Sequence, residues 1–123
     1  MVHPYKASKA WHTSVELAAD VEHLIVRLTD NGEPALARRI KQASTSAHLW
    51  LADSHRHEHQ SERSACYKKA RDAVEQMYVD LDLAHSFHYI DSALHEQLLS
   101  RTIGIYRLLS ELIQTTNKTI STS

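Results

Sequence analysis

The sequence predicts an all-α protein, an antiparallel up-down-up-down four-helix bundle, from three observations. The 123 residues include only two glycines and two prolines, so residues that punctuate strands and tight turns are scarce. Apolar residues recur at spacings of three and four along four segments, the periodicity of amphipathic helices. The segments are joined by short polar connections, which make consecutive helices antiparallel. At this length we expect a single domain, residues 1–123, with one core.

The first helix is predicted over residues 8–29, where a broad apolar face recurs at helical spacing. Its members are Ala10, Trp11, Val15, Leu17, Ala18, Val21, Leu24, Ile25 and Leu28. The segment TDNGEP ends this helix, because Asn31 and Gly32 can take the left-handed conformation. Pro34 suits the first turn of the next helix.

The second helix is predicted over residues 33–56 and carries a heptad-like apolar seam. The seam consists of Leu36, Ile40, Ala43, Ala47, Trp50 and Ser54, at spacings of four, three, four, three and four. Its small members, Ala43 and Ala47, allow a neighbouring helix to approach closely, and Trp50 fills space one turn further on.

The third helix is predicted over residues 60–86, capped by Ser61 or the residue before it. Its core stripe is Tyr67, Ala70, Val74, Met77, Leu81 and Ala84. The fourth is predicted over residues 91–115, with Asp91 as the N-cap. Its apolar positions are Leu94, Leu98, Leu99, Thr102, Ile105, Leu109, Leu112 and Ile113. The polar tail 116–123 is expected to fray.

A second apolar stripe, Val79, Leu83 and Phe87, lies roughly opposite the Met77 and Leu81 side of the third helix. Large apolar groups facing water favour burial, so we interpret this stripe as a subunit interface. Alternatively, the core is wide enough to bury this stripe, or the connection at 88–90 covers it.

The composition disfavours binding to nucleic acid through overall charge and excludes a membrane-spanning protein. A formal net charge of −1 provides no overall field that would draw the chain onto nucleic acid or an anionic membrane. No apolar run is long enough to span a bilayer. The single Cys66 cannot form an internal disulfide, and no apolar signal segment opens the sequence, which together indicate a cytoplasmic protein.

Four segments of the chain share a characteristic order of small and polar residues: KAWHTSVELAADVEHLIVRLT, ARRIKQASTSAHLWLADSHR, SERSACYKKARDAVEQMYVDLDLA and LLSRTIGIYRLLSELIQ. Together, over about residues 5–115, they resemble the bacterial four-helix-bundle family of 23S rRNA intervening-sequence proteins. Matches to the family's motifs in the second and third helices are Arg39, Ile40, Ala43, Ser46, Leu51, Ala52, Asp53, Ala70, Arg71 and Leu81. The chain departs from those motifs at Trp50, where the family has Asn, at Ser54 (Gly), Asp72 and Ala73 (Gly-Ser) and Gln76 (Glu).

The resemblance implies a small cytosolic helical protein, often a homopentamer, whose biochemical role is undetermined. The family is also similar in fold to the accessory protein of diversity-generating retroelements, a barrel-like pentamer that binds nucleic acid and the reverse transcriptase. A heterologous ring would account for the second apolar stripe, because it buries one patch of each subunit against a different patch of its neighbour.

The segment LWLADSHRHEHQSER places three histidines within five residues. His55 and His59 would lie one helical turn apart and could share a metal ion if the helix continued that far. Two ligands do not complete a site, so these are weak candidates. We interpret the segment as a solvated helix end between the second and third helices, with a pH-sensitive or subunit contact as a further alternative.

Basic residues on the second and third helices are candidates for contact with the phosphates of RNA, DNA or a nucleoprotein. They are Arg38, Arg39, Lys41, Arg63, Lys68, Lys69 and Arg71. In an antiparallel hairpin Arg38 and Arg39 reach the level of Asp80 and Asp82, so solvated ion pairing explains them as well.

We expect no enzymatic activity and no cofactor. Cys66 is predicted to be a buried, inert thiol, and no histidine beside it is apparent from the sequence. Ser44, Thr45 and Ser46 lie in mid-helix without the glycines of a nucleophile turn or of a phosphate-binding loop. The arginine–histidine spacing of four-helix ribonucleases is absent. The sequence therefore predicts an oligomeric scaffold or interaction module, with a nucleic-acid adaptor and a histidine-based metal protein as alternatives.

Overall fold

The computed structural model describes residues 4–122, with side chains from residue 7 to residue 118. Over this range it consists of four helices without a strand: α1 (Pro4–Asp30), α2 (Pro34–Ser54), α3 (Gln60–Ser86) and α4 (Ser92–Thr122). The predicted all-α class and the four helical segments are confirmed. None of these helices is both long and apolar enough to cross a membrane, as far as the described residues extend.

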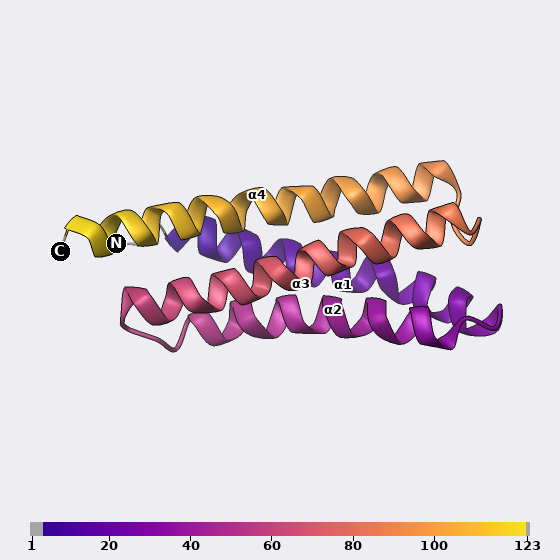
Figure 1. Ribbon diagram of the computed structural model, residues 1–123, viewed down its shortest axis with the longest axis horizontal. Coiled ribbons are helices and arrows are strands. Elements are labelled where there is room, and N and C mark those ends of the chain that lie inside the picture. Colours follow the sequence, from indigo (N-terminus) through magenta and orange to yellow (C-terminus); the bar gives the residue numbers. More distant parts are fainter. Residues whose placement is uncertain (1–3, 123) are drawn as a thin grey trace.

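The helices lie side by side along one long axis (Figure 1). The α1–α2 and α3–α4 connections lie at one end, and the α2–α3 connection lies at the other end, where α1 begins and α4 terminates. Each helix packs against two others, in the cyclic order α1, α2, α3, α4. Among residues 4–122, the backbones of α1 and α3 do not approach each other closely, nor do those of α2 and α4, so these pairs lie diagonally across the core.

One core cluster joins all four helices. Every member of the predicted α3 stripe is buried, from Tyr67 to Ala84. The α2 seam is buried except for Trp50, which packs at its edge. On α1 the buried line runs through Leu17, Val21, Leu24 and Leu28, whereas Val15, predicted to share that face, is 39% exposed.

α1 and α3 end in the same kind of cap. The amide of Glu33 donates to the carbonyl of Leu28 at 2.8 Å, with Gly32 between them at a φ of +80°. The left-handed conformation predicted for Gly32 is confirmed, and Asn31 does not share it. At the end of α3 the amide of Tyr89 donates to the carbonyl of Ala84 at 2.9 Å, and His88 has a φ of +64°. Both are Schellman caps, which satisfy the last carbonyls of a helix.

The residues predicted to begin α2 and α4 are found there, whereas the residue that caps α3 differs from the prediction. Pro34 occupies the first turn of α2, and the Asp91 carboxylate accepts a hydrogen bond from the Leu94 amide at 2.8 Å, so both predictions are confirmed. The N-cap of α3 is His59, without a side-chain capping bond, and not Ser61 or Gln60. The carbonyl of His59 already accepts from the Arg63 amide, which places the helix start one residue earlier.

The outer ends of α1 and α4 extend beyond the predicted limits. The prediction of a frayed tail over 116–123 is wrong up to Thr122, and α1 begins before residue 8. Thr116 is fully buried, with its hydroxyl donating to the Leu112 carbonyl at 2.6 Å, and Asn117 accepts a hydrogen bond from Ser64 of α3. Tertiary burial of polar residues holds the last turns, which hydrophobic periodicity does not reveal.

Candidate functional site

The α2–α3 connection begins where α2 stops at Ser54, two residues before the predicted limit. Ser54 is 1% exposed, and its hydroxyl donates to the Leu51 carbonyl of the same helix at 2.6 Å. His55 is the C-cap of α2 and His59 is the N-cap of α3, and both are exposed. The condition under which these two histidines could share a metal ion, a helix that continues from His55 to His59, is therefore not met.

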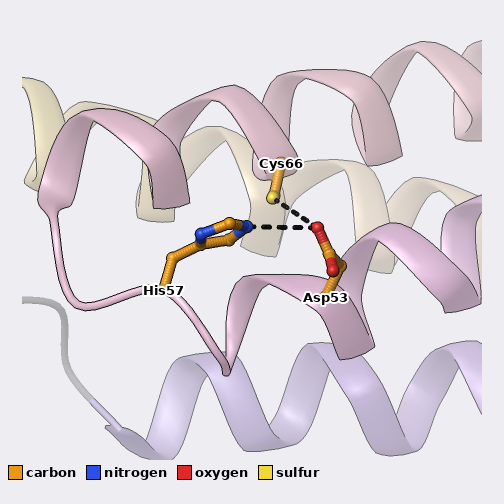
Figure 2. Close-up of side chains that lie close together, drawn as sticks. All are labelled: Asp53, His57 and Cys66. Atoms are coloured by element: carbon orange, nitrogen blue, oxygen red, sulfur yellow. Dashed lines mark hydrogen bonds and ion pairs between the residues drawn. The ribbon is translucent and has the colours of Figure 1, made fainter.

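His57, the middle histidine of the segment, turns inward toward α2 and α3 (Figure 2). Its Nε2 lies 3.2 Å from Oδ2 of Asp53 in the last turn of α2, and Sγ of Cys66 on α3 lies 3.6 Å from the same oxygen (Figure 2). The sulfur, nitrogen and oxygen all lie within 4.8 Å of one another. The cluster is half-open: the side chains of His57 and Asp53 are 23% and 27% exposed, whereas Cys66 is buried.

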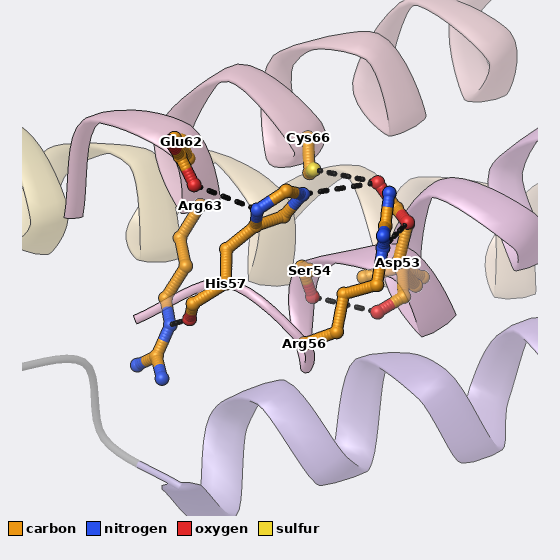
Figure 3. A network of polar contacts seen from close by, with 8 residues as sticks. Asp53, Ser54, Arg56, His57, Glu62, Arg63 and Cys66 are labelled. Carbon is orange, nitrogen blue, oxygen red and sulfur yellow. Dashed lines mark hydrogen bonds and ion pairs between the residues drawn. The ribbon is translucent and has the colours of Figure 1, made fainter. Parts of the chain in front are cut away.

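Charged residues surround the three groups (Figure 3). Oε2 of Glu62 lies 2.7 Å from Nδ1 of His57, on the far side of the ring from Asp53. The guanidinium of Arg56 pairs with Oδ1 of Asp53. Arg63 donates from Nε to the backbone carbonyl of His57 at 2.6 Å, which fixes the turn. The imidazole therefore lies between two carboxylates, held from both sides and through its backbone.

The protonation states follow from these contacts. Hydrogen bonds from Arg56 and then His57 lower the pKa of Asp53, so the carboxylate is charged at neutral pH. Burial, and then the hydrogen bond to Asp53, raise the pKa of the Cys66 thiol. A catalytic cysteine needs the opposite shift, because the thiolate is the nucleophile. The buried thiol that the sequence predicts for Cys66 is confirmed, but a histidine does lie beside it.

A groove lies between α3 and α4, with a volume of about 410 Å³. Its lining residues are Val74, Glu75, Tyr78, Val79, Thr102, Ile103 and Tyr106. Val79 and Phe87 of the predicted second stripe are 50% and 61% exposed, and Leu83 is partly buried. Ile90 of the 88–90 connection is buried in the core, and Val79 and Phe87 remain exposed.

Four of the seven basic candidates are engaged within the chain. Arg39 pairs with Asp80 at 2.8 Å and Arg63 binds the His57 carbonyl. Lys69 lies 4.3 Å from the ring centroid of Trp50, and Arg71 lies 5.9 Å from that of Tyr106. Arg38, Lys41 and Lys68 are exposed.

A second, more polar groove of about 350 Å³ lies between α2 and α3. Its lining residues are three matches to the motifs, Arg39, Ala43 and Ser46, two departures from them, Ala73 and Gln76, and Gln42. Gln76 donates to the Asp80 carboxylate at 3.1 Å, beside the Arg39 ion pair. The polar network at these positions therefore closes on Asp80.

No protein-family model matches the chain, and no curated protein matches it. Among solved structures, the chain is similar to a protein of unknown function from the S23 ribosomal protein family of Bacteroides thetaiotaomicron. The two are 18% identical, and the alignment covers 89% of this chain and 98% of that chain with a TM-score of 0.84. At this identity the likeness shows the shared all-helical fold.

Proposed function

We propose that this chain is a non-enzymatic, cytoplasmic helical-bundle protein of the intervening-sequence type, which assembles with copies of itself into a ring and serves as a scaffold for a partner. The sequence segments that resemble this family and the all-helical structural neighbour both support this class. The ring is the specific part of the proposal, and the exposed apolar side of α3 and α4 carries it.

That side presents more apolar surface than an isolated bundle covers. Tyr78, Val79 and Ile103 border the α3–α4 groove with exposures of 43%, 50% and 36%. Burial of one such side chain contributes about 1.5 to 3 kcal/mol relative to leaving it in water. A groove framed by three of them is therefore suited to an apolar ridge of another subunit.

α1 offers a second apolar surface on the other side of the bundle. Val15 and Val26 are 39% and 53% exposed and lie opposite the buried line of α1. Because α1 and α3 are diagonal, these valines face away from the α3–α4 groove. Two different apolar faces on opposite sides favour heterologous contacts, which close into a ring. The net charge of −1 opposes such self-association very little.

Light scattering coupled to gel filtration tests the assembly. The chain has a mass of 14.0 kDa, so a pentamer has a mass of about 70 kDa. Val79→Glu places a charge at the border of the groove, and the mass is expected to fall toward that of one chain. Val26→Glu is expected to have the same effect, because it alters the complementary face.

Leu49→Glu is the matched control. Leu49 is 58% exposed, between His48, which contacts Trp11 of α1, and Trp50, which contacts Lys69 of α3. It therefore points outward from α2, away from both faces, and the mass of this variant should stay unchanged. A wild-type chain that elutes at 14.0 kDa at every concentration, or a Val79→Glu variant that keeps the multimer, contradicts the ring.

The same wild-type preparation tests nucleic acid as the partner. Ring assembly would repeat Arg38, Lys41 and Lys68 in every subunit and raise their combined avidity. An electrophoretic shift with RNA that weakens steeply with salt identifies a nucleic-acid adaptor. Absence of a shift at low salt removes the nucleic-acid adaptor as an alternative.

A further inference from the structure

We propose that Asp53, His57 and Cys66 form a binding site for a zinc ion at the α2–α3 connection. The site is independent of the ring: it lies beside the turn between α2 and α3, and none of its residues lines the α3–α4 groove (Figure 2). One ligand comes from the last turn of α2, one from the connection and one from the second turn of α3.

Two of the three distances between the ligand atoms match a tetrahedral zinc site. Zinc binds oxygen and nitrogen at about 2.0 to 2.1 Å and thiolate sulfur at about 2.3 Å. Tetrahedral angles then place nitrogen about 3.3 Å from oxygen and sulfur about 3.5 Å from oxygen. The observed separations are 3.2 Å between Nε2 and Oδ2 and 3.6 Å between Sγ and Oδ2. The third separation, from sulfur to nitrogen, is at most 4.8 Å, so a small rotation of one side chain closes the triangle.

The surroundings supply the support that metal-bound histidines need. A ligating imidazole commonly donates its second N–H to a carboxylate, which fixes the tautomer and orients the ring. Glu62 occupies that position at 2.7 Å from Nδ1, so a ring that carries its proton on Nδ1 presents the Nε2 lone pair to the metal. Arg63 holds the backbone of His57 in place.

The donor set and the charges select the kind of metal. One thiolate, one imidazole and one carboxylate suit a borderline-soft cation such as Zn²⁺ and do not suit Mg²⁺ or Ca²⁺. On binding, the Cys66 thiol releases its proton to solvent and a zinc–sulfur bond forms. Thiolate and Asp53 then neutralise the two charges of the ion, while Arg56 and Glu62 balance each other.

The exposed edges of Asp53 and His57 provide an entry path and leave the fourth position to water. Such an ion would join the end of α2 to the start of α3 through three bonds. We therefore expect zinc to stabilise this end of the bundle, since a ligand that binds only the folded state raises its unfolding temperature.

Calorimetric titration of reduced, metal-free protein with zinc chloride tests the site, with magnesium chloride as the negative control. One zinc ion per chain is expected, and no heat from magnesium. His57→Ala and Cys66→Ser should each abolish binding or weaken it by more than Glu62→Gln, for which about a 10- to 100-fold loss is expected. Cobalt supplies an independent readout, because a thiolate ligand produces a charge-transfer absorption that Cys66→Ser must remove.

His55→Ala and His59→Ala are the matched controls, because these exposed histidines flank His57 in the same segment. Both variants should bind zinc as the wild type does. Circular dichroism of each variant establishes that it is folded, and the half-exposed Glu62 provides a test that leaves the core intact. The proposal fails if the wild type binds no zinc, if cobalt gives no thiolate absorption, if His57→Ala or Cys66→Ser binds zinc as the wild type does, or if binding is lost in a folded His55→Ala or His59→Ala variant.

Discussion

Nη2 of Arg39 lies 2.8 Å from Oδ1 of Asp80, in an ion pair between a half-exposed guanidinium on α2 and a fully buried carboxylate on α3. The second carboxylate oxygen, Oδ2, is buried without a hydrogen-bond partner among the described residues. Burial raises the pKa of Asp80, and the opposing effects of Arg39 and Gln76 do not cancel it. The charged carboxylate is therefore costly where it lies, as buried ion pairs often are.

Asp80→Asn is expected to leave the fold intact and to keep or raise its stability at pH 7. A pKa that is raised in the folded state means that stability falls as pH increases from the usual carboxyl value of 3.8 through the folded value. The neutral amide removes this loss, so the variant's advantage should be largest at neutral pH and vanish below about pH 3.8. Chemical denaturation of both proteins across this range measures the difference.

Asp72→Asn is the control for that experiment, because it removes the same charge from an exposed position of α3. Its free energy of unfolding should stay within about 0.5 kcal/mol of the wild type. If Asp80→Asn instead lowers stability by several kcal/mol at pH 7, the Arg39 pair outweighs burial and the interpretation of Asp80 is wrong.

The last turns of α4 should respond to substitution as part of the core. Thr116→Asp places an unpaired charge at a fully buried position and is expected to lower the free energy of unfolding by about 2 kcal/mol or more. Gln114→Asp adds the same charge two residues earlier, at an exposed position, and should lower the free energy of unfolding by about 0.5 kcal/mol at most. Thermal denaturation compares the two variants. Equal, small effects would mean that the helix end is frayed, as its polar composition suggests.

The fold could be predicted because helical periodicity is a local property of the chain. The α3 stripe from Tyr67 to Ala84 repeats at three and four residues, and the structure buries all of it. The ends of α1 and α4 could not be predicted in this way. Thr116 and Asn117 are polar, and only contacts with other helices show that they are held.

The candidate site was missed for a related reason. Among the three clustered histidines, helical spacing points only to His55 and His59, as weak metal-ligand candidates on the condition that the helix continues through the histidine segment. The helix stops at Ser54, so His57 turns back toward Asp53 and meets Cys66 from the next helix. The spacing of four between Asp53 and His57 was visible in the sequence. Its pairing with Cys66 depends on how α3 packs across the turn, which no local pattern encodes.

Gly32 and His88 occupy equivalent positions in the caps of α1 and α3, so substitutions there should have opposite signs. An L-residue in the left-handed region costs about 1 kcal/mol, whereas glycine adopts it freely. Gly32→Ala is therefore expected to lower the free energy of unfolding by about 1 kcal/mol, and His88→Gly to raise it by up to about the same amount.

His88 is exposed, so its replacement removes little packing. His88→Ala separates the backbone effect from loss of the imidazole, because alanine keeps the strained Cβ and should bring no comparable gain. If urea denaturation shows equal gains for His88→Ala and His88→Gly, the imidazole and not the left-handed backbone is the source of the cost.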